Sequence, residues 1–463
     1  MTKDKEFMGT MPIRKLLVQL SVPAMIGMIV NALYNLVDTI FVGHGAGSMA
    51  IAGLSIAFPV QMLVGAFAQM FGVGAASIVS LKLGEKKEKE ASLAAGNGIT
   101  LALITALIIA LLGSIFMTPL LQIIGASSVI LPYASDYLHI ILIGSFFLTF
   151  SFYSNNLIRS EGNAKQAMRI MLSGAIINII LDPIFIFGFD LGIKGAAYAT
   201  VISQVISSGI ALKYFLQKKG LIRFHTSSFK LQSKMAKDIS LLGISSFIRQ
   251  LGGSLIAVFM NNLLGIYGGD LAIAAYGMVT KVMMICLMPI FGILQGFQPI
   301  AGYNYGAQKY SRVRKVLIDA IAAATIMGII FELFLQIFPG TILSMFTTDQ
   351  ELLAIAIPAL QTVTMTIFVI GIQGTGSTYF QAIGKSKPAI FLGLSRQFIF
   401  FIPILFIMAH YFGLMGIWMT APISDILATI ITAIWSTKDI KKLPKDVQEI
   451  EIKKRLILEE KTV

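Results

Sequence analysis

Charge is scarce in this sequence. Asp, Glu, Lys and Arg make up 13% of its 463 residues, whereas soluble domains carry about 25%. Hydrophobic residues make up 56%, and they form repeated runs of about 20 residues, each long enough to cross a bilayer as a helix. The net charge of +13 lies almost wholly in short loops and tails, which is typical of membrane topology rather than of nucleic-acid binding. The composition predicts an all-α protein with many membrane spans.

Several motifs are also missing. The single cysteine, Cys286, excludes an intramolecular disulfide and a cysteine-based metal cluster. The alternation of polar and apolar residues expected of a membrane β-barrel does not occur. The stretch "GVGAAS" lacks the preceding strand and the lysine of a phosphate-binding loop, so an ion gradient is the natural energy source. Because no nucleophile–base pair or HExxH pattern is present, we expect neither an enzyme nor a cofactor.

Hydropathy predicts twelve spans with both termini in the cytoplasm. With this orientation, 32 of the 36 Lys and Arg residues fall on the cytoplasmic side, which the positive-inside rule favours. The predicted spans are residues 16–42, 50–80, 93–117, 131–157, 167–188, 195–216, 237–265, 271–301, 315–339, 351–381, 388–410 and 414–436.

The chain contains an internal repeat. A shift of 222 residues places "GHGAGSMAIA" (43–52) on "GIYGGDLAIA" (265–274) and Gly84 on Gly306. Each half holds six spans, so the halves form parallel lobes related by a pseudo-two-fold axis along the membrane normal. The predicted parts are an N-lobe (1–217), a cytoplasmic linker (218–236), a C-lobe (237–437) and a cytoplasmic tail (438–463).

Polar residues inside the spans break this repeat. A carboxylate costs several kcal/mol to place in hydrocarbon, about 2.5 to 3.5 by insertion measurements, so it usually has a function. The first half carries Asn31, Asn35 and Asp38 on one helix face, Asn178 and Asp182 one turn apart, and Thr200. Their counterparts in the second half are Gly253, Ala257, Met260, Phe400, Ile404 and Ala421.

Such a cluster can hold either of two coupling ions. Two carboxylates with amide and hydroxyl oxygens suit a hard cation such as Na⁺, and a desolvated carboxyl group can instead carry a proton. Pro183 is expected to bend its helix and free the carbonyl oxygen of Ile179 as a further ligand. In the alternative interpretation, Asp38 and Asp182 only join helices.

The second half holds different polar residues. Arg249, Lys281 and Arg396 lie within its spans, with Glu332 and Asp425 as acids. These residues form internal ion pairs or contact a substrate. The stretch "KVMMICLMPIF" (281–291) is suited to lining a cleft for varied apolar ligands. The candidate cleft residues are Asn31, Tyr34, Arg249, Lys281, Met284 and Gln295.

Two motifs resemble a known family. "DTIFVGHGAGSMAIAGLS" (38–55) and "GILQGFQPIAGYNYGAQKYSRV" (292–313) are similar to the multidrug and toxic compound extrusion (MATE) transporters, in the bacterial branch of DinF-like and MepA-like exporters. The resemblance covers residues 10–437. It implies alternating-access export of organic, often cationic, drugs across the cytoplasmic membrane in exchange for H⁺ or Na⁺. It assigns Asp38, Asn178, Asp182 and Thr200 to the ion site, which the oxygen cluster extends with Asn35.

Three other functions compete with this hypothesis. A lipid-linked precursor flippase of the same superfamily would need a strongly basic cleft, for which only Arg249, Lys281 and Arg396 are candidates. The sequence lacks the catalytic motifs that a membrane-embedded enzyme would need. A passive channel would not need a coupling-ion site. The expected partners are drug-like small molecules and the lipid bilayer, with no nucleic acid and no obligate protein partner.

Overall fold

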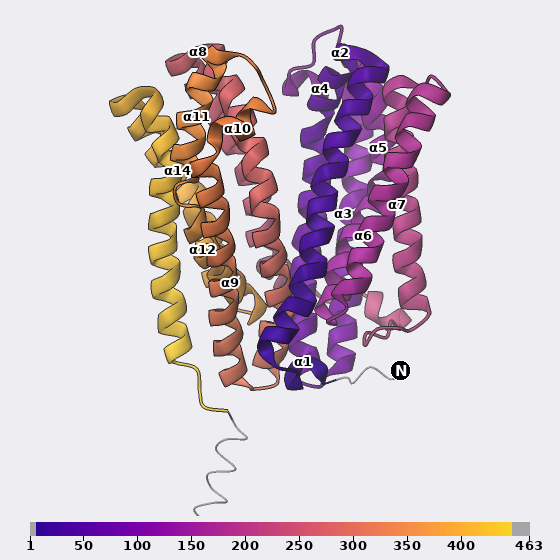
Figure 1. The fold of residues 1–463 in the computed structure, drawn as a ribbon. Coiled ribbons are helices and arrows are strands. Elements are labelled where there is room, and N and C mark those ends of the chain that lie inside the picture. The colour runs from indigo at the N-terminus through magenta and orange to yellow at the C-terminus, as the bar shows by residue number, and fades with distance from the viewer. Residues whose placement is uncertain (1–5, 447–463) are drawn as a thin grey trace, which may run out of the picture. The chain divides into compact units, whose positions relative to one another are not determined.

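The structure, a computed structural model, describes residues 6–446 and, within them, all side chains except those of residues 35, 36 and 48. The described residues form helices and turns (Figure 1). Their elements are α1 (Phe7–Thr10), α2 (Ile13–Gly84), α3 (Glu88–Ile115), α4 (Met117–Ile124), α5 (Leu131–Ser160), α6 (Ala164–Pro183), η1 (Ile184–Gly188), α7 (Gly192–Leu216), η2 (Thr226–Phe229), α8 (Ser233–Gly306), α9 (Tyr310–Ile337), α10 (Pro339–Ser344), α11 (Gln350–Thr364), α12 (Ile367–Ala382), α13 (Ser386–Leu394), η3 (Ser395–Phe401) and α14 (Ile402–Lys441).

The number of spans agrees with the prediction. In the described part of the chain, nine helices are long and apolar enough to cross a membrane, and α11 with α12 forms a tenth span that bends by 43°. Two of the nine, Ser233–Gly306 with 74 residues and Ser386–Lys441 with 56, are too long for one crossing, since about 20 residues suffice. Each is interrupted by a glycine with non-helical backbone, Gly269 or Gly413, so the described helices provide twelve spans.

Three of the turns between the predicted spans consist of a single glycine with non-helical backbone, namely Gly47, Gly269 and Gly413. Gly47 and Gly269 have φ of 81° and 66°, values that favour a residue without a side chain. Residues with positive φ also recur at equivalent positions of the two halves. The recurring pairs are Gly47 and Gly269, Lys86 and Gln308, Gly162 and Gly384, and Gly192 and Gly413. The backbone therefore confirms the repeat.

The chain divides into two compact units whose limits differ from the predicted lobes. Unit 1 comprises Met1–Val22, Ser77–Ala91 and Ile256–Val463, and unit 2 comprises Pro23–Ala76 and Ser92–Leu255. The helices α2, α3 and α8 pass from one unit to the other. The lobe limits at 217 and 237 stay a prediction about the repeat. The predicted tail starts inside α14, and its part from residue 447 lies outside the described residues.

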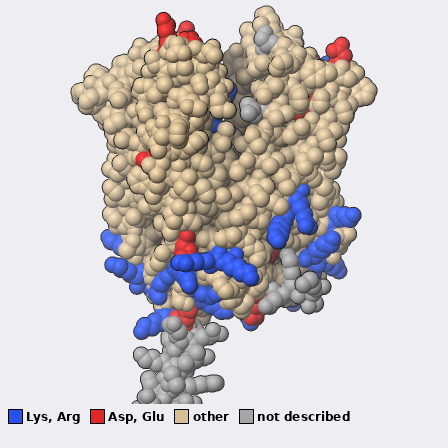
Figure 2. Space-filling model, in the orientation of Figure 1, with Lys and Arg blue, Asp and Glu red and all other residues tan. Residues whose placement is uncertain are grey.

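Each unit has its own apolar core. In unit 2 the core joins Val42 and Ala57 of α2 to Leu138 of α5, and in unit 1 it joins Val279 of α8 to Leu360 of α11. Large apolar side chains such as Leu111 and Ile318 are exposed, as expected for helices that face lipid. On the face drawn in Figure 2, most Lys and Arg side chains gather at the end of the helices where α1 lies.

Candidate coupling-ion site

The α6 helix presents the two polar residues that the sequence placed one turn apart. Asn178 and Asp182 are both buried, as expected for two side chains four residues apart on one helix face. The α6 helix ends at Pro183, and the backbone continues as the π-helical turn η1. Proline has no N–H to donate to the preceding turn, and the regular helix ends at Pro183, one residue after Asp182. The helix changes type after Pro183, while the predicted bend and the free carbonyl oxygen of Ile179 stay predictions.

Four of the predicted ion-site residues come together inside unit 2. Nδ2 of Asn178 donates to Oδ1 of Asp182 at 3.2 Å and reaches Oγ1 of Thr200 on α7 at 3.5 Å. The side chains of Asp38, on α2, and Asp182 interact electrostatically with each other. Asp182 is 0% exposed and Asp38 8%. Three segments distant in sequence thus meet at one buried polar centre.

This centre holds oxygen atoms with unused lone pairs. Among the described residues, Oδ1 of Asp38, Oδ1 of Asn178 and Oδ2 of Asp182 are buried and accept no hydrogen bond. Leaving a buried acceptor unpaired costs about 1–3 kcal/mol, so a proton or a small cation that satisfies these atoms is stabilised there. The described residues contain no group of three His, Cys, Asp or Glu side chains that could hold a metal ion.

One buried residue of this site escaped the sequence reasoning. Tyr137, on α5, is 2% exposed, and its phenol interacts electrostatically with Asp38, Asp182 and Tyr34. A lone tyrosine in an apolar helix is usually a core residue, so its position gave no signal. Tyr34, predicted as a cleft residue, therefore lies near the ion site. Asn31 is half-buried on α2, and the side chain of Asn35 lies outside the described residues.

The remaining candidate cleft residues are divided between the units. Arg249 belongs to unit 2, and its guanidinium donates to Oγ of Ser246 at 2.9 Å on the same helix. Lys281 and Met284 are exposed and Gln295 is half-buried, all three on the part of α8 that belongs to unit 1. Their contact with a substrate stays a prediction.

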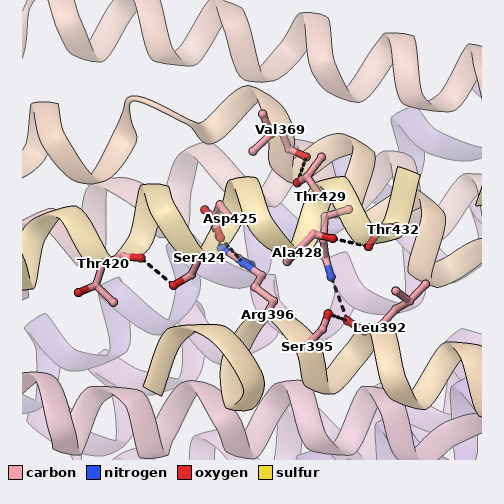
Figure 3. Close-up of polar contacts among 11 residues, drawn as sticks. Val369, Leu392, Ser395, Arg396, Thr420, Ser424, Asp425, Ala428, Thr429 and Thr432 are labelled. Carbon is pink, nitrogen blue, oxygen red and sulfur yellow. Dashed lines mark hydrogen bonds and ion pairs between the residues drawn. The ribbon is translucent and has the colours of Figure 1, made fainter. Parts of the chain in front are cut away.

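The second half neutralises its buried acid internally (Figure 3). Nε of Arg396, in η3, lies 2.6 Å from Oδ1 of Asp425, and Nη2 lies 3.4 Å from Oδ2. The Asp425 side chain is 4% exposed and that of Arg396 27%. One of the two predicted interpretations, an internal ion pair, is confirmed for these residues.

Comparison with known proteins supplies the family context. The MatE family model matches residues 23–184 and again 245–407, two segments that begin 222 residues apart. The multidrug export protein MepA of Staphylococcus aureus (strain MSSA476) is 28% identical over 419 residues, which cover 90% of this chain and 92% of MepA. MepA of Staphylococcus haemolyticus (strain JCSC1435) is 29% identical over 403 residues, which cover 87% of this chain and 88% of the relative.

Solved structures agree with this match. A crystal structure of MATE in complex with MaL6 superposes with a TM-score of 0.88 at 29% identity, over 96% of this chain and 99% of that one. A superfamily relative from Pyrococcus furiosus Vc1 (DSM3638), a MOP transporter whose reversed pocket polarity suggests a different function, superposes with a TM-score of 0.87 at 29% identity, over 96% and 99%.

Proposed function

Since this chain belongs to the MatE family, whose members are membrane transporters rather than enzymes, we propose that it exports drug-like organic compounds, many of them cationic, in exchange for H⁺ or Na⁺. It does so across the cytoplasmic membrane with both termini inside. The similarity to multidrug export proteins supports the substrate class. The positive-inside pattern supports the orientation.

The observation that carries the coupling is the buried pair of Asp38 and Asp182. Two acids share a centre with Asn178, and three of its oxygens accept no hydrogen bond from the described residues. Two carboxylates that interact in a buried centre repel each other when both are charged, and a proton on either one removes this repulsion, so the pair supports H⁺ as the coupling ion. Sodium would bind while both carboxylates are charged, with the same oxygens as its ligands.

Exchange requires that the ion bind the two access states unequally. Binding at this site joins α2, α6 and α7, because its ligands come from all three helices. The η1 turn after Pro183 leaves the adjoining backbone without regular α-helical bonding, which suits a segment that changes shape when the ion arrives. An ion that enters the site from outside the cell thus favours the conformation in which the drug has left the protein.

The flippase alternative is weakened by the second half. Of its three candidate cations, Arg396 is committed to Asp425, and Arg249 donates to Ser246. A pyrophosphate headgroup needs several convergent cations.

The test is uptake of a fluorescent cationic dye into everted membrane vesicles, with a proton gradient and a sodium gradient imposed separately. We expect uptake under one gradient and its loss in Asp182→Asn. Asp136→Asn is the matched control, because the Asp136 side chain on α5 is 46% exposed and pairs with Lys194 at 3.2 Å. No uptake under either gradient would favour the flippase, and uptake with Asp182→Asn at the parent rate would refute the site.

A further inference from the structure

We propose that residues 6–12 and 222–232 are two equivalent clasps, which hold the cytoplasmic starts of α2 and α8 and release them when the transporter opens toward the cytoplasm. Residues 6–12 are called the first clasp and residues 222–232 the second clasp. Each clasp ends directly before the start of a long helix, which is Ile13 for α2 and Ser233 for α8.

The first clasp is held through its backbone. Nδ2 of Asn304 donates to the carbonyl oxygen of Met8 at 3.0 Å. The guanidinium of Arg312 donates to the carbonyl oxygens of Met8 at 3.2 Å and of Met11 at 2.7 Å. Because α1 is one turn long, these carbonyls have no partner further along a helix. The Met8 side chain is 0% exposed, so the segment is seated firmly.

Charged groups complete this attachment. Nζ of Lys309 donates to the carbonyl oxygen of Gly9 at 2.9 Å, and Lys86 pairs with Glu6 at 2.7 Å. Arg312 also donates from Nε to Oδ1 of Asn304 at 2.8 Å, which fixes the two main holding residues relative to each other. Charged donors make the stronger hydrogen bonds, so Arg312 is the residue whose loss weakens the clasp most.

The second clasp is held in the same manner by α3. The side chain of Asn97, 0% exposed, donates to the carbonyl oxygens of Ser228 and Lys230, both at 3.1 Å. Its Oδ1 accepts from the backbone N–H of Gln232 at 2.7 Å. Thr100 donates to the carbonyl oxygen of Phe229 at 3.2 Å. The predicted linker is therefore attached to α3 rather than free.

The repeat relates the two clasps to each other. The shift of 222 residues carries Met8 to Lys230, two residues whose carbonyls are held, and carries Glu88, the start of α3, to Tyr310, the start of α9. The first clasp, in the first half, is held by Asn304 of α8 and Arg312 of α9, both in the second half. The second clasp, which leads into the second half, is held by α3 of the first. Each half thus holds the segment that precedes the first long helix of the other half.

Close backbone contact underlies the first clasp. A Cβ atom on Gly84 would lie 2.0 Å from the carbonyl oxygen of Tyr303, and one on the equivalent Gly306 would lie 2.0 Å from that of Leu81. Leu81 and Tyr303 are themselves equivalent under the shift. The helix ends beside the first clasp thus meet across the axis of the repeat. Alternating access moves one half against the other, so contacts that join the halves on one side must break in each cycle.

The test uses single cysteines as reporters of release. Cys286 is the only native cysteine, so Cys286→Ser provides a clean parent, to which Met8→Cys or Ser228→Cys is added. Both positions are buried, at 0% and 5% exposed. A membrane-impermeant maleimide is added to everted vesicles without drug, and labelling is timed. Lys442→Cys, at an exposed position, reports the rate of unhindered reaction.

We expect slow labelling of both reporters in the parent. Arg312→Ala should speed labelling of Met8→Cys at least fivefold, and Asn97→Ala should do the same for Ser228→Cys. Arg314→Ala is the matched control, because Arg314 lies two positions further on α9 but donates to the carbonyl oxygen of Leu443. Arg312→Gln is a milder second variant if Arg312→Ala does not fold.

Labelling that stays at the parent rate in Arg312→Ala, Arg312→Gln and Asn97→Ala would contradict the proposal that these side chains hold the two clasps. Labelling that rises equally in Arg314→Ala would do so as well, since the effect would then be unspecific. The role in export rests on the proposed function, and dye uptake by the same vesicles tests that function separately. Absence of uptake in the parent refutes the export hypothesis, while the labelling rates still decide whether the clasps exist.

Discussion

The two halves of this protein bury acids in opposite ways. Asp425 in the second half lies against Arg396 at 2.6 Å, so its charge is neutralised within the fold. Asp38 and Asp182 in the first half have each other, Asn178 and unused oxygens. A buried charge needs either a fixed partner or an exchangeable one. The difference indicates that the second-half acid stabilises the fold and that the first-half pair binds the exchanged ion.

The largest effect should come from the first-half pair. Asp182→Asn and Asp38→Asn remove the exchangeable charge but keep the size of the side chain, so we expect gradient-driven dye uptake to fall to background. Membrane insertion should be unchanged. Uptake and expression are measured in the same vesicles, with Asp136→Asn as control. Uptake above half of the parent level in either variant would contradict the claim that the first-half acids bind the coupling ion.

Breaking the second-half pair should affect stability instead. Removing one partner leaves an uncompensated buried charge, which costs about 3 kcal/mol, so Arg396→Gln should lower the melting temperature in detergent clearly. The double variant Arg396→Gln with Asp425→Asn should recover most of that loss. If the double variant melts normally but exports nothing, Asp425 takes part in exchange and the comparison fails.

A smaller effect should follow from crowding the contact between the halves. Gly84→Ala or Gly306→Ala forces a methyl group against a carbonyl oxygen, and overpacking of this kind costs about 1–3 kcal/mol. Gly209→Ala, in α7, meets nothing within 4 Å and serves as the control. Thermal melting that does not separate these variants would contradict the close approach.

The smallest effect concerns the exposed pair of Glu6 and Lys86. The hydrogen bond from Lys86 holds the pKa of Glu6 below its usual value. A carboxyl group with a depressed folded-state pKa contributes its stability above the unfolded-state pKa and loses it as pH falls through the folded-state pKa. Glu6→Gln should therefore melt slightly lower than the parent at pH 7 and equally at pH 3.5. A difference that grows in acid would contradict this contact.

Much of the fold and part of the site could be predicted from the sequence. The spans followed from apolar runs, and Asn178 and Asp182 from helical spacing. Asp38 could be added because the repeat showed which half had kept its polar residues. Tyr137 could not be found, since a tyrosine in an apolar helix looks like core. The clasps were also missed, because the groups held are the backbone carbonyls of residues such as Met8 and Lys230, which every sequence possesses.

The most direct test of the central claim is ion release on drug binding by the purified protein. The dye is added to the protein in weakly buffered detergent solution, and proton release is followed with a pH indicator, or sodium release with a sodium electrode. The account predicts that dye binding releases ions from the parent and from Asp425→Asn with Arg396→Gln, but not from Asp182→Asn. Dye binding by the parent without release of either ion would contradict exchange at the Asp38 and Asp182 pair.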